Sequence, residues 1–413
     1  MEKDFNFKDM KKDSVTEVVQ NIFLQVAASG DEAVRQITQK YDKKNVTNFV
    51  FNTDQEVTQK LDPQFDDLIL QTIESIKAFH EKTALQSFSM TTNDQIQITN
   101  LVSPIPSVGL YIPGGKSPLV STLMMLVIPA QIAKVKFIAV FTPPQKEGLP
   151  SPIIHRTCQL LGIKNIYCVG GAQAIAAMAM GTESLPQVEK IIGPGNDYVT
   201  QAKLVASKNP WNRAIDGVAG PSELLLYLQS EESVSWAAFE LLTQVEHGQG
   251  SWSLALVSSK KLKAKLTQKI DELRYQYLIA QELIDRIEIE IVESKELAEL
   301  RIQEVSPEHL CIDDYDMKLW MNSIPYAGAV YLNSKTSVVL GDYGIGPNHT
   351  LPTGGWASRT SAISVRDFQK TTHIVQNLGR ENSIWKTVSR LANLEMMDLH
   401  SLAALKQIQG IEK

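Results

Sequence analysis

Four short segments of the sequence carry side chains whose types suit metal binding and proton transfer. In the first segment, Gln244 and His247 lie three residues apart just before Gly248, so a helix would present both on one face, where they could chelate a metal ion. A histidine near a helix C-terminus is also favoured by the helix dipole alone. This pair on its own therefore fits a metal site and an ordinary polar helix face.

The second segment contains Glu308 and His309, which follow Pro307 at the entry to the apolar run 310–312. A carboxylate beside an imidazole at a strand end is a credible general acid/base pair. If the strand begins here, the two adjacent side chains should point to opposite sides of the sheet. As an isolated dipeptide the pair could equally be incidental.

The third and fourth segments add one carboxylate and one histidine each. Asp342 and His349 lie in a glycine-rich loop, although a purely structural loop would also contain glycines. Glu395 and His400 lie five residues apart in an expected C-terminal helix, which separates them by about 140° around its axis. They cannot face one point unless the helix ends or bends, and His400 could be an ordinary surface residue.

Three glycine-containing turns follow expected strands, at 113–115, 170–173 and 193–196. Such turns let backbone amides approach a ligand at the carboxyl ends of parallel strands, where open α/β sheets bind nucleotides. None of the turns matches the pattern GxGxxG, and each alone fits a structural role. Three equivalent strand ends together favour a binding crevice.

The elements that would position these residues form two α/β series. The first begins at Ser107, and the second follows the segment AGPSELLLYL. In both, apolar strand-like segments alternate with helical ones, which predicts mostly parallel sheets. The first series has expected strands at 107–112, 136–142, 165–171 and 188–193; the second has them at 252–258, 286–293, 309–312 and 329–333.

The expected fold class is therefore α/β, with two Rossmann-like domains of incomplete, parallel-sheet type and helical extensions at both ends. We assign residues 1–110 and 224–365 to the first α/β domain, with a helical N-terminal part. Residues 111–223 form an inserted second α/β domain, and residues 366–413 form a helical C-terminal tail without strands.

Composition excludes several classes of partner. The chain of 413 residues is 43% hydrophobic, and its net charge of -6 with scattered Lys and Arg argues against a nucleic-acid partner. The most apolar stretch, 118–133, contains Pro129 and is shorter than the roughly 20 residues that cross a bilayer, so we expect no membrane partner. The N-terminal segment lacks the pattern of a secretory signal, and Cys158, Cys168 and Cys311 form no CxxC pair, so we expect a cytoplasmic location.

Taken together and in order, the segments resemble the histidinol dehydrogenase family over nearly the whole chain. The resemblance is carried by the strings SGDEAVRQITQKYD, SVGLYIPGG, VGGAQAIAAMAMGTES, KIIGPGNDYVTQAK, AGPSELLL, ELLTQVEHG, PEHL, GDYGIGPNHTLPT and DFQK.

The resemblance implies a four-electron oxidation in the last steps of histidine biosynthesis. L-histidinol would pass through an aldehyde to L-histidine while two NAD molecules are reduced. It also implies a zinc ion, for which the matching ligands are Gln244, His247, Asp342 and His400. These nitrogen and oxygen donors are chemically reasonable for zinc. Residues 1–110 and 224–365 would then carry most of the zinc site, and residues 111–223 would lie on the NAD side.

By the same resemblance, His309 would be the base for the alcohol proton, and Glu308 would activate water for attack on the aldehyde, again with help from His309. The positions that match substrate contacts are Ser222, Gln244, His247, His309, Asp342, His349, Glu395 and His400, and those that match NAD contacts are Tyr111, Gln173 and Asn196.

The family likeness further implies a homodimer with shared active sites, in which the C-terminal tail completes the partner's site. His400 and Glu395 would then reach a neighbour's zinc. The tail is also where the sequence departs from the family, because LEMMDLHSLAAL replaces the usual Glu-Gly-Leu-x-x-His and its following arginine. In addition, Val218 stands where the family usually has proline.

Three alternatives remain open at this stage. One is an aldehyde dehydrogenase with Cys311 as thiol nucleophile, although Cys311 lies in an apolar run typical of a core strand. A second is the same scaffold acting on another small alcohol, such as a sulfonated diol. The third is a non-catalytic paralogue with a binding or structural role.

Overall fold

The computed structural model of the chain describes residues 9–55, 61–114, 118–217, 220–248, 250–379 and 383–409. The chain divides into two compact units. The larger unit comprises Met1–Thr83 and Ile105–Phe368, and the smaller unit comprises Ala84–Pro104 and Gln369–Lys413. Within the described ranges, no helix combines the length and hydrophobicity needed to cross a membrane.

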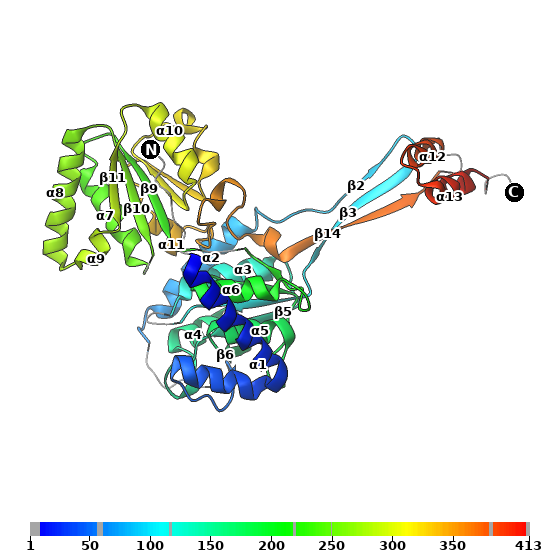
Figure 1. Ribbon diagram of the computed structural model, residues 1–413, viewed down its shortest axis with the longest axis horizontal. Coiled ribbons are helices and arrows are strands. Elements are labelled where there is room, and N and C mark those ends of the chain that lie inside the picture. Colours follow the sequence, from blue (N-terminus) through cyan, green and yellow to red (C-terminus); the bar gives the residue numbers. More distant parts are fainter. Residues whose placement is uncertain are drawn as a thin grey trace. The chain divides into compact units, whose positions relative to one another are not determined.

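The larger unit contains two sheets (Figure 1). The first has the strand order β1-β6-β5-β4-β7-β8. All neighbouring pairs are parallel except β1 with β6. The strands are β1 Val50–Asn52, β4 Ser107–Tyr111, β5 Phe137–Thr142, β6 Asn165–Cys168, β7 Lys190–Ile192 and β8 Ala214–Ile215. The connecting helices are α3 Val120–Ile132, α4 Pro152–Leu160, α5 Gly171–Met180 and α6 Asp197–Ala206, with a 3-10 turn η1 at Lys146–Gly148.

The predicted alternation of strand and helix is thus confirmed for the first sheet. Helix α3 is mostly apolar, and every residue from Ser121 to Ala130 is buried. A helix without a polar face belongs in an interior, which explains why the most apolar stretch of the sequence is a core helix.

The N-terminal helices pack differently from the sequence-based grouping of residues 1–110 with 224–365. Helix α1 (Asp9–Asp42) packs on α5 and α6, and α2 (Phe65–His80) packs on α3 and α4. The apolar side chains of Val19, Phe23 and Val26 share one core with α5, and β1 extends the first sheet. The N-terminal segment therefore completes the first sheet's layers, because that is where its apolar face is buried.

The second sheet of the larger unit is entirely parallel, with the order β11-β10-β9-β12-β13. Its strands are β9 Glu223–Leu228, β10 Trp252–Val257, β11 Ile287–Ile291, β12 His309–Ile312 and β13 Ala329–Leu332. Its helices are α7 Val234–Glu246, α8 Lys260–Tyr277, α9 Gln281–Ile284, α10 Lys295–Val305 and α11 Val339–Tyr343. Short 3-10 turns are η2 Met317–Trp320, η3 Ile324–Tyr326, η4 Trp356–Ser358 and η5 Val365–Phe368.

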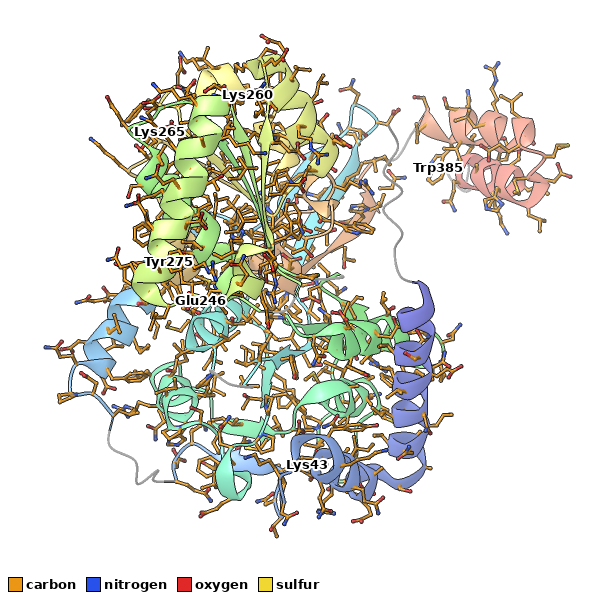
Figure 2. The ribbon with its side chains drawn as sticks, turned by 60° about the vertical axis from the view of Figure 1, so that its left-hand side comes forward. Lys43, Glu246, Lys260, Lys265, Tyr275 and Trp385 are labelled. Carbon is orange, nitrogen blue, oxygen red and sulfur yellow. The ribbon has the colours of Figure 1, made fainter. Side chains whose placement is uncertain are left out.

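Separate apolar clusters cover the two faces of this second sheet. Strands buried on both faces read as mostly apolar runs, which is why the sequence revealed β10 and β12, whereas the edge strand β11 showed alternation. Strand β9 was not among the expected strands, although all its residues are buried. Helix α8 buries residues at helical spacing, from Leu262 to Leu273, while Lys260, Lys265 and Tyr275 point outward (Figure 2).

The smaller unit combines an antiparallel ribbon with a helical pair (Figure 1). Its strands are β2 Phe88–Thr91, β3 Ile96–Pro104 and β14 Gln369–Asn377, and its helices are α12 Ile384–Leu394 and α13 Asp398–Gln409. The prediction that 366–413 contains no strand is wrong, because β14 pairs with β3 along its whole length. Almost all side chains of β14 are exposed, so no alternation of apolar and polar residues marks it as a strand.

Candidate functional site

A cavity of 180 Å³ in the larger unit gathers residues from three of the four chemistry-bearing segments. Its lining includes Ser222, His247, Glu308, His309, Asp342 and His349. Helix α3 of the first sheet contributes Ser121 and Thr122 to the wall. These six predicted site residues therefore converge, with side chains from both α/β halves around them, whereas Gln244, Tyr111, Gln173 and Asn196 are not part of the lining.

The cavity lies at the amino ends of the strands of the second sheet. Ser222 immediately precedes β9, and His309 is the first residue of β12. Helix α7 returns from β9 to the start of the parallel strand β10, so its C-terminus, with Gln244 and His247, reaches the same edge. Ligands more often bind at carboxyl ends in open α/β sheets, but the expected place of Glu308 and His309 at the entry to their strand agrees with the amino ends.

Glu308 and His309 form a close pair inside the cavity. The Glu308 Oε2 atom lies 3.5 Å from His309 Nδ1, and it accepts a hydrogen bond of 2.9 Å from the backbone N–H of Glu223. The expectation of opposite sides required a strand that includes Glu308, and this condition is not met. Strand β12 begins only at His309. Glu308 therefore lies outside the strand, and its side chain need not point away from that of His309.

The surroundings of the His309 ring determine which of its nitrogen atoms carries the proton. Its Nδ1 lies 3.3 Å from the backbone carbonyl oxygen of Glu223, which can only accept, so Nδ1 carries the proton. The buried Nε2 atom finds no hydrogen-bond partner among the described residues. Burial lowers the pKa of His309, but the charges of Glu308 and Asp342 more than offset it, so the pKa is raised above its usual value. His309 thus offers a basic lone pair.

His247, Asp342 and Gln244 supply donors that suit a metal ion. The Nε2 atom of His247 lies 3.9 Å from Asp342 Oδ2. Gln244 is 1% exposed, and in the described part of the chain neither polar atom of its amide has a hydrogen-bond partner. An unsatisfied buried polar group costs about 1–3 kcal/mol, so a missing partner is indicated here. No group of three or more His, Cys, Asp and Glu side chains within the described ranges is arranged to hold a metal, so this donor set depends on the Gln244 amide and on a further ligand.

The loop with Asp342 is held in place from two sides. Glu240 of α7 accepts a hydrogen bond of 2.9 Å from the backbone N–H of Val338, at the start of α11. His349 donates from Nδ1 to the carbonyl oxygen of Asp342 at 3.0 Å, and its Nε2 lies 2.8 Å from the Thr122 hydroxyl. Burial lowers the pKa of His349, so the ring is neutral and bridges this loop to α3.

Sequence reasoning missed Glu240. Burial raises the pKa of its carboxyl group, with Asp342 adding to the effect. The available signal was an acidic residue one helical turn before Gln244, on the same apolar face of α7.

Glu395 and His400 lie in the smaller unit, in two different elements. Glu395 follows the last residue of α12, whereas His400 belongs to α13. The expectation of one helix is wrong, because Met396 has φ of 57° and Met397 donates back to Ala392, which ends α12. The helical offset between the two residues therefore does not apply. Both are exposed on this unit.

The residues predicted to contact NAD lie at the carboxyl ends of strands of the first sheet. Tyr111 ends β4, Gln173 lies in the first turn of α5 after β6, and Asn196 precedes α6 after β7. The Tyr111 hydroxyl accepts from the backbone N–H of Gly171, Gln173 donates to Asp42, and Asn196 accepts from Val199. Only β4 and β7 are neighbours, because β5 lies between β4 and β6, and these polar atoms are engaged within the protein. Gly115 of the first turn, like Val218, lies outside the described residues.

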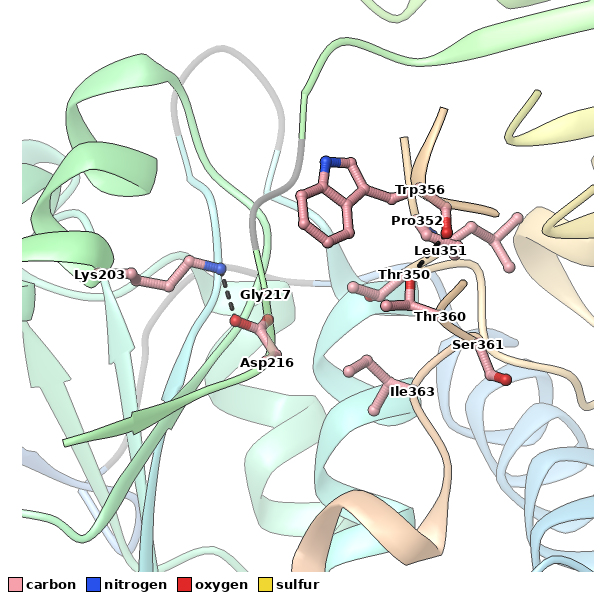
Figure 3. Close-up of a pocket in the computed structure, with 10 residues that line it drawn as sticks. All are labelled: Lys203, Asp216, Gly217, Thr350, Leu351, Pro352, Trp356, Thr360, Ser361 and Ile363. Carbon is pink, nitrogen blue, oxygen red and sulfur yellow. Dashed lines mark hydrogen bonds and ion pairs between the residues drawn. The ribbon is translucent and has the colours of Figure 1, made fainter. Parts of the chain in front are cut away.

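A smaller cavity of 80 Å³ shares Thr350 and Leu351 with the first (Figure 3). Lys203 forms a buried ion pair of 2.6 Å with Asp216 on one wall. The Lys203 ammonium also donates to the carbonyl oxygen of Gly193, whose N–H donates to Asp216. Lys203 and Asp216 thus both bind the main chain of Gly193 and hold the turn after β7 in place.

Comparisons with known proteins extend over almost the whole chain. A sequence model of the family described as histidinol dehydrogenase matches residues 6–407. A histidinol dehydrogenase of Legionella pneumophila (strain Paris) is 38% identical over 400 residues, which are 94% of this chain and 92% of the relative. That of Escherichia coli (strain K12) is 33% identical over 408 residues, which are 97% and 93%.

Structural comparison agrees with these matches. A crystal structure of histidinol dehydrogenase from Elizabethkingia anophelis matches with a TM-score of 0.90 and 31% identity, covering 97% of this chain and 93% of that one. The likeness thus includes the segments that line the 180 Å³ cavity, and the chain belongs to the histidinol dehydrogenase family.

Proposed function

We propose that the chain is a zinc-dependent, NAD-linked enzyme that oxidises L-histidinol through its aldehyde to L-histidine. The observation that carries this proposal is the pairing of Glu308 with a basic His309 in the cavity that His247 and Asp342 also line. Membership of the family indicates the substrate, because the relatives bear the name histidinol dehydrogenase.

His309 is the base of the first oxidation. Its Nε2 lone pair, which has no partner in the described structure, accepts the proton of the substrate hydroxyl. The hydrogen bond from Nδ1 to the Glu223 carbonyl fixes the orientation of the ring while this proton is held. Bound NAD supplies the hydride acceptor in each of the two oxidations.

Glu308 acts in the second oxidation, where water must add to the aldehyde. Its carboxylate is the base that removes the water proton, and His309 beside it assists. The backbone N–H of Glu223 holds one carboxylate oxygen in place. This division gives each member of the pair a distinct proton to move.

Gln244, His247 and Asp342 would hold zinc together with His400 of the partner subunit, which completes the four ligands. Their nitrogen and oxygen donors, and the unpaired amide of Gln244 within the described residues, fit such an ion. Zinc would supply an anchor for the imidazole and amine of the substrate. Ser222 and His349 would contact the substrate from the cavity wall, and Glu395 of the partner subunit would do so from its tail.

NAD would lie on the side of the first sheet, near Tyr111, Gln173 and Asn196. The support for this is their position at the carboxyl ends of parallel strands of one sheet. A cytoplasmic location is also part of the proposal, and the free, buried thiols of all three cysteines support it.

We further propose a homodimer with shared sites, in which the ligand is His400 of the partner subunit. Large apolar side chains on the helical pair of the smaller unit are exposed, which supports burial against a second copy. They are Leu391, Leu394, Met396, Met397, Leu399 and Leu402.

Co-expression of two inactive variants tests the shared site. His400→Ala and His247→Ala chains should together restore about a quarter of wild-type activity, because a mixed dimer keeps one complete site. Co-expressed His247→Ala and Asp342→Ala are the matched control, since both changes fall in the same half of the site and should restore none. Restoration in the control, or none in the test pair, would contradict shared sites.

The substrate is tested by product analysis. The zinc-loaded protein is incubated with NAD and either L-histidinol or a small sulfonated diol, and products are identified by mass spectrometry. We expect L-histidine from histidinol and no reaction with the diol. Oxidation of the diol alone would move the activity to another alcohol, and no reaction with any alcohol would indicate a non-catalytic protein.

A further inference from the structure

Glu223 is a buried carboxylate directly behind the acid/base pair. It is the first residue of β9, which lies between β10 and β12 in the second sheet. Its backbone N–H donates to Glu308, and its backbone carbonyl accepts from His309. The main chain at this one position therefore contacts both members of the pair.

The side chain of Glu223 reaches a different part of the cavity wall. Its Oε1 atom accepts a hydrogen bond of 2.8 Å from the backbone N–H of Gly354. Gly354 and Gly355 have φ values of 63° and 76°, which L side chains rarely adopt, so the turn depends on glycine. Thr353 in the same turn lines the cavity and accepts from the backbone N–H of Gly220. Glu223 thus joins the cavity wall to the acid/base pair.

This arrangement keeps a carboxyl group where burial disfavours its charge. Glu223 is 6% exposed, and its Oε2 atom has no hydrogen-bond partner within the described ranges. The next residues of β9, from Leu224 to Leu228, are all buried and apolar or aromatic. Burial, with Glu308 adding to it, raises the pKa of Glu223 to about 7. A polar group retained at such a position is more typical of a functional site than of a core.

We propose that Glu223 is a positioning residue of the reaction, whose side chain fixes the 353–355 turn against the strand that holds Glu308 and His309. The inference rests on the proposed function, since it concerns the same acid/base pair. The hydrogen bond from Gly354, and not the negative charge, performs this role, because Gly354 is the partner of the carboxylate and a glutamine oxygen can accept in its place.

Two substitutions separate the hydrogen bond from the charge. Glu223→Gln keeps an acceptor for Gly354, so kcat with histidinol should stay within about threefold of wild type. Glu223→Ala removes the acceptor and lets the turn and the pair shift, and a misplacement of about 1 Å costs about 100-fold in rate. We expect kcat to fall about 10- to 100-fold at unchanged zinc content, with KM for histidinol altered less than about threefold.

Asp313→Ala is the matched control. Asp313 is a buried carboxylate that follows β12, at the carboxyl ends of the strands and away from the cavity. It accepts hydrogen bonds from the N–H groups of Gln229 and Ser230 and from the Ser233 hydroxyl. Its removal should lower stability while kcat per bound zinc stays at the wild-type level. Equal loss of kcat in this control would reduce Glu223 to a purely structural role and overturn the proposal.

Hydrogen exchange gives a readout that does not depend on histidinol. In peptides spanning 350–358, Glu223→Ala should speed exchange at Gly354, whereas Glu223→Gln and Asp313→Ala should leave it at the wild-type rate. Unchanged exchange in Glu223→Ala, a wild-type kcat in that variant, or a Gln variant as slow as the Ala variant would each overturn the role. If wild type itself fails to oxidise histidinol, the proposed function fails, and the exchange measurement alone then decides whether Glu223 holds the turn.

Discussion

Replacing Glu308 with glutamine separates the two oxidations. The amide oxygen of glutamine can still accept from the backbone N–H of Glu223, which lies 2.9 Å from the carboxylate, so the side chain keeps its place. The substitution removes the negative charge that serves as base for water. A positioned general base contributes about 100- to 10,000-fold, or about 3–5 kcal/mol, and the aldehyde step should slow by this factor. The alcohol step should slow less than about tenfold, because His309 remains.

The same substitution has a defined effect on pH dependence. Burial lowers the pKa of His309, and Glu308 is the main cause that raises it. Removal of that charge should therefore lower the pKa of His309. Because the base must be unprotonated, the acidic limb of the alcohol step should move to lower pH.

Single-turnover absorbance of NADH resolves the steps. Wild type should form NADH in two phases, whereas Glu308→Gln should complete the first phase and accumulate an aldehyde that a carbonyl reagent traps. Glu304→Gln, an exposed substitution just upstream, is the matched control and should behave as wild type. Equal slowing of both phases, or a shift of the acidic limb to higher pH, would refute the assigned roles.

Three further predictions follow from buried groups. Burial raises the pKa of the Cys311 thiol well above its usual value, so Cys311→Ala should leave kcat within about threefold; loss of turnover with zinc retained would revive a thiol nucleophile. A Cβ on Gly341, the residue before Asp342, would overlap the Tyr331 hydroxyl, so Gly341→Ala should weaken zinc binding by about 10- to 100-fold. A metal titration measures this loss, and adding Tyr331→Phe to the same chain should restore part of the affinity. The pKa of Glu223 is raised from 4.5 to about 7 in the folded protein, so wild type loses stability as pH rises through this window. Glu223→Gln should therefore be more stable than wild type by up to about 3 kcal/mol at pH 8 but not at pH 4, as measured by denaturant unfolding.

Much of the larger unit could be predicted from sequence for one physical reason. Strands covered on both faces, such as β10 and β12, carry mostly apolar side chains, and the helices between them show helical spacing. These constraints are local, so they are visible in a single sequence. The partners of α1 were not, because an apolar helix face shows that it is buried but not against which sheet.

The smaller unit shows the opposite case. Strand β14 is held by backbone hydrogen bonds to β3, a segment far away in the chain, and its exposed side chains record no buried face. The break between Glu395 and His400 depends on the left-handed backbone of Met396, a residue type that does not mark such a turn.

Within the site, residue types were predictable but their supports were not. Glu308, His309 and Asp342 stood out because carboxylates and imidazoles bear chemistry. Glu223 and Glu240 act through backbone N–H groups of Gly354 and Val338, and such contacts exist only after the chain has folded.

The stoichiometry of NADH per histidinol consumed tests the proposed reaction most directly. With zinc-loaded protein, excess NAD and limiting L-histidinol, two NADH should form for each histidinol that becomes histidine. One NADH per histidinol with release of aldehyde would contradict the role of Glu308, and none would contradict histidinol oxidation altogether.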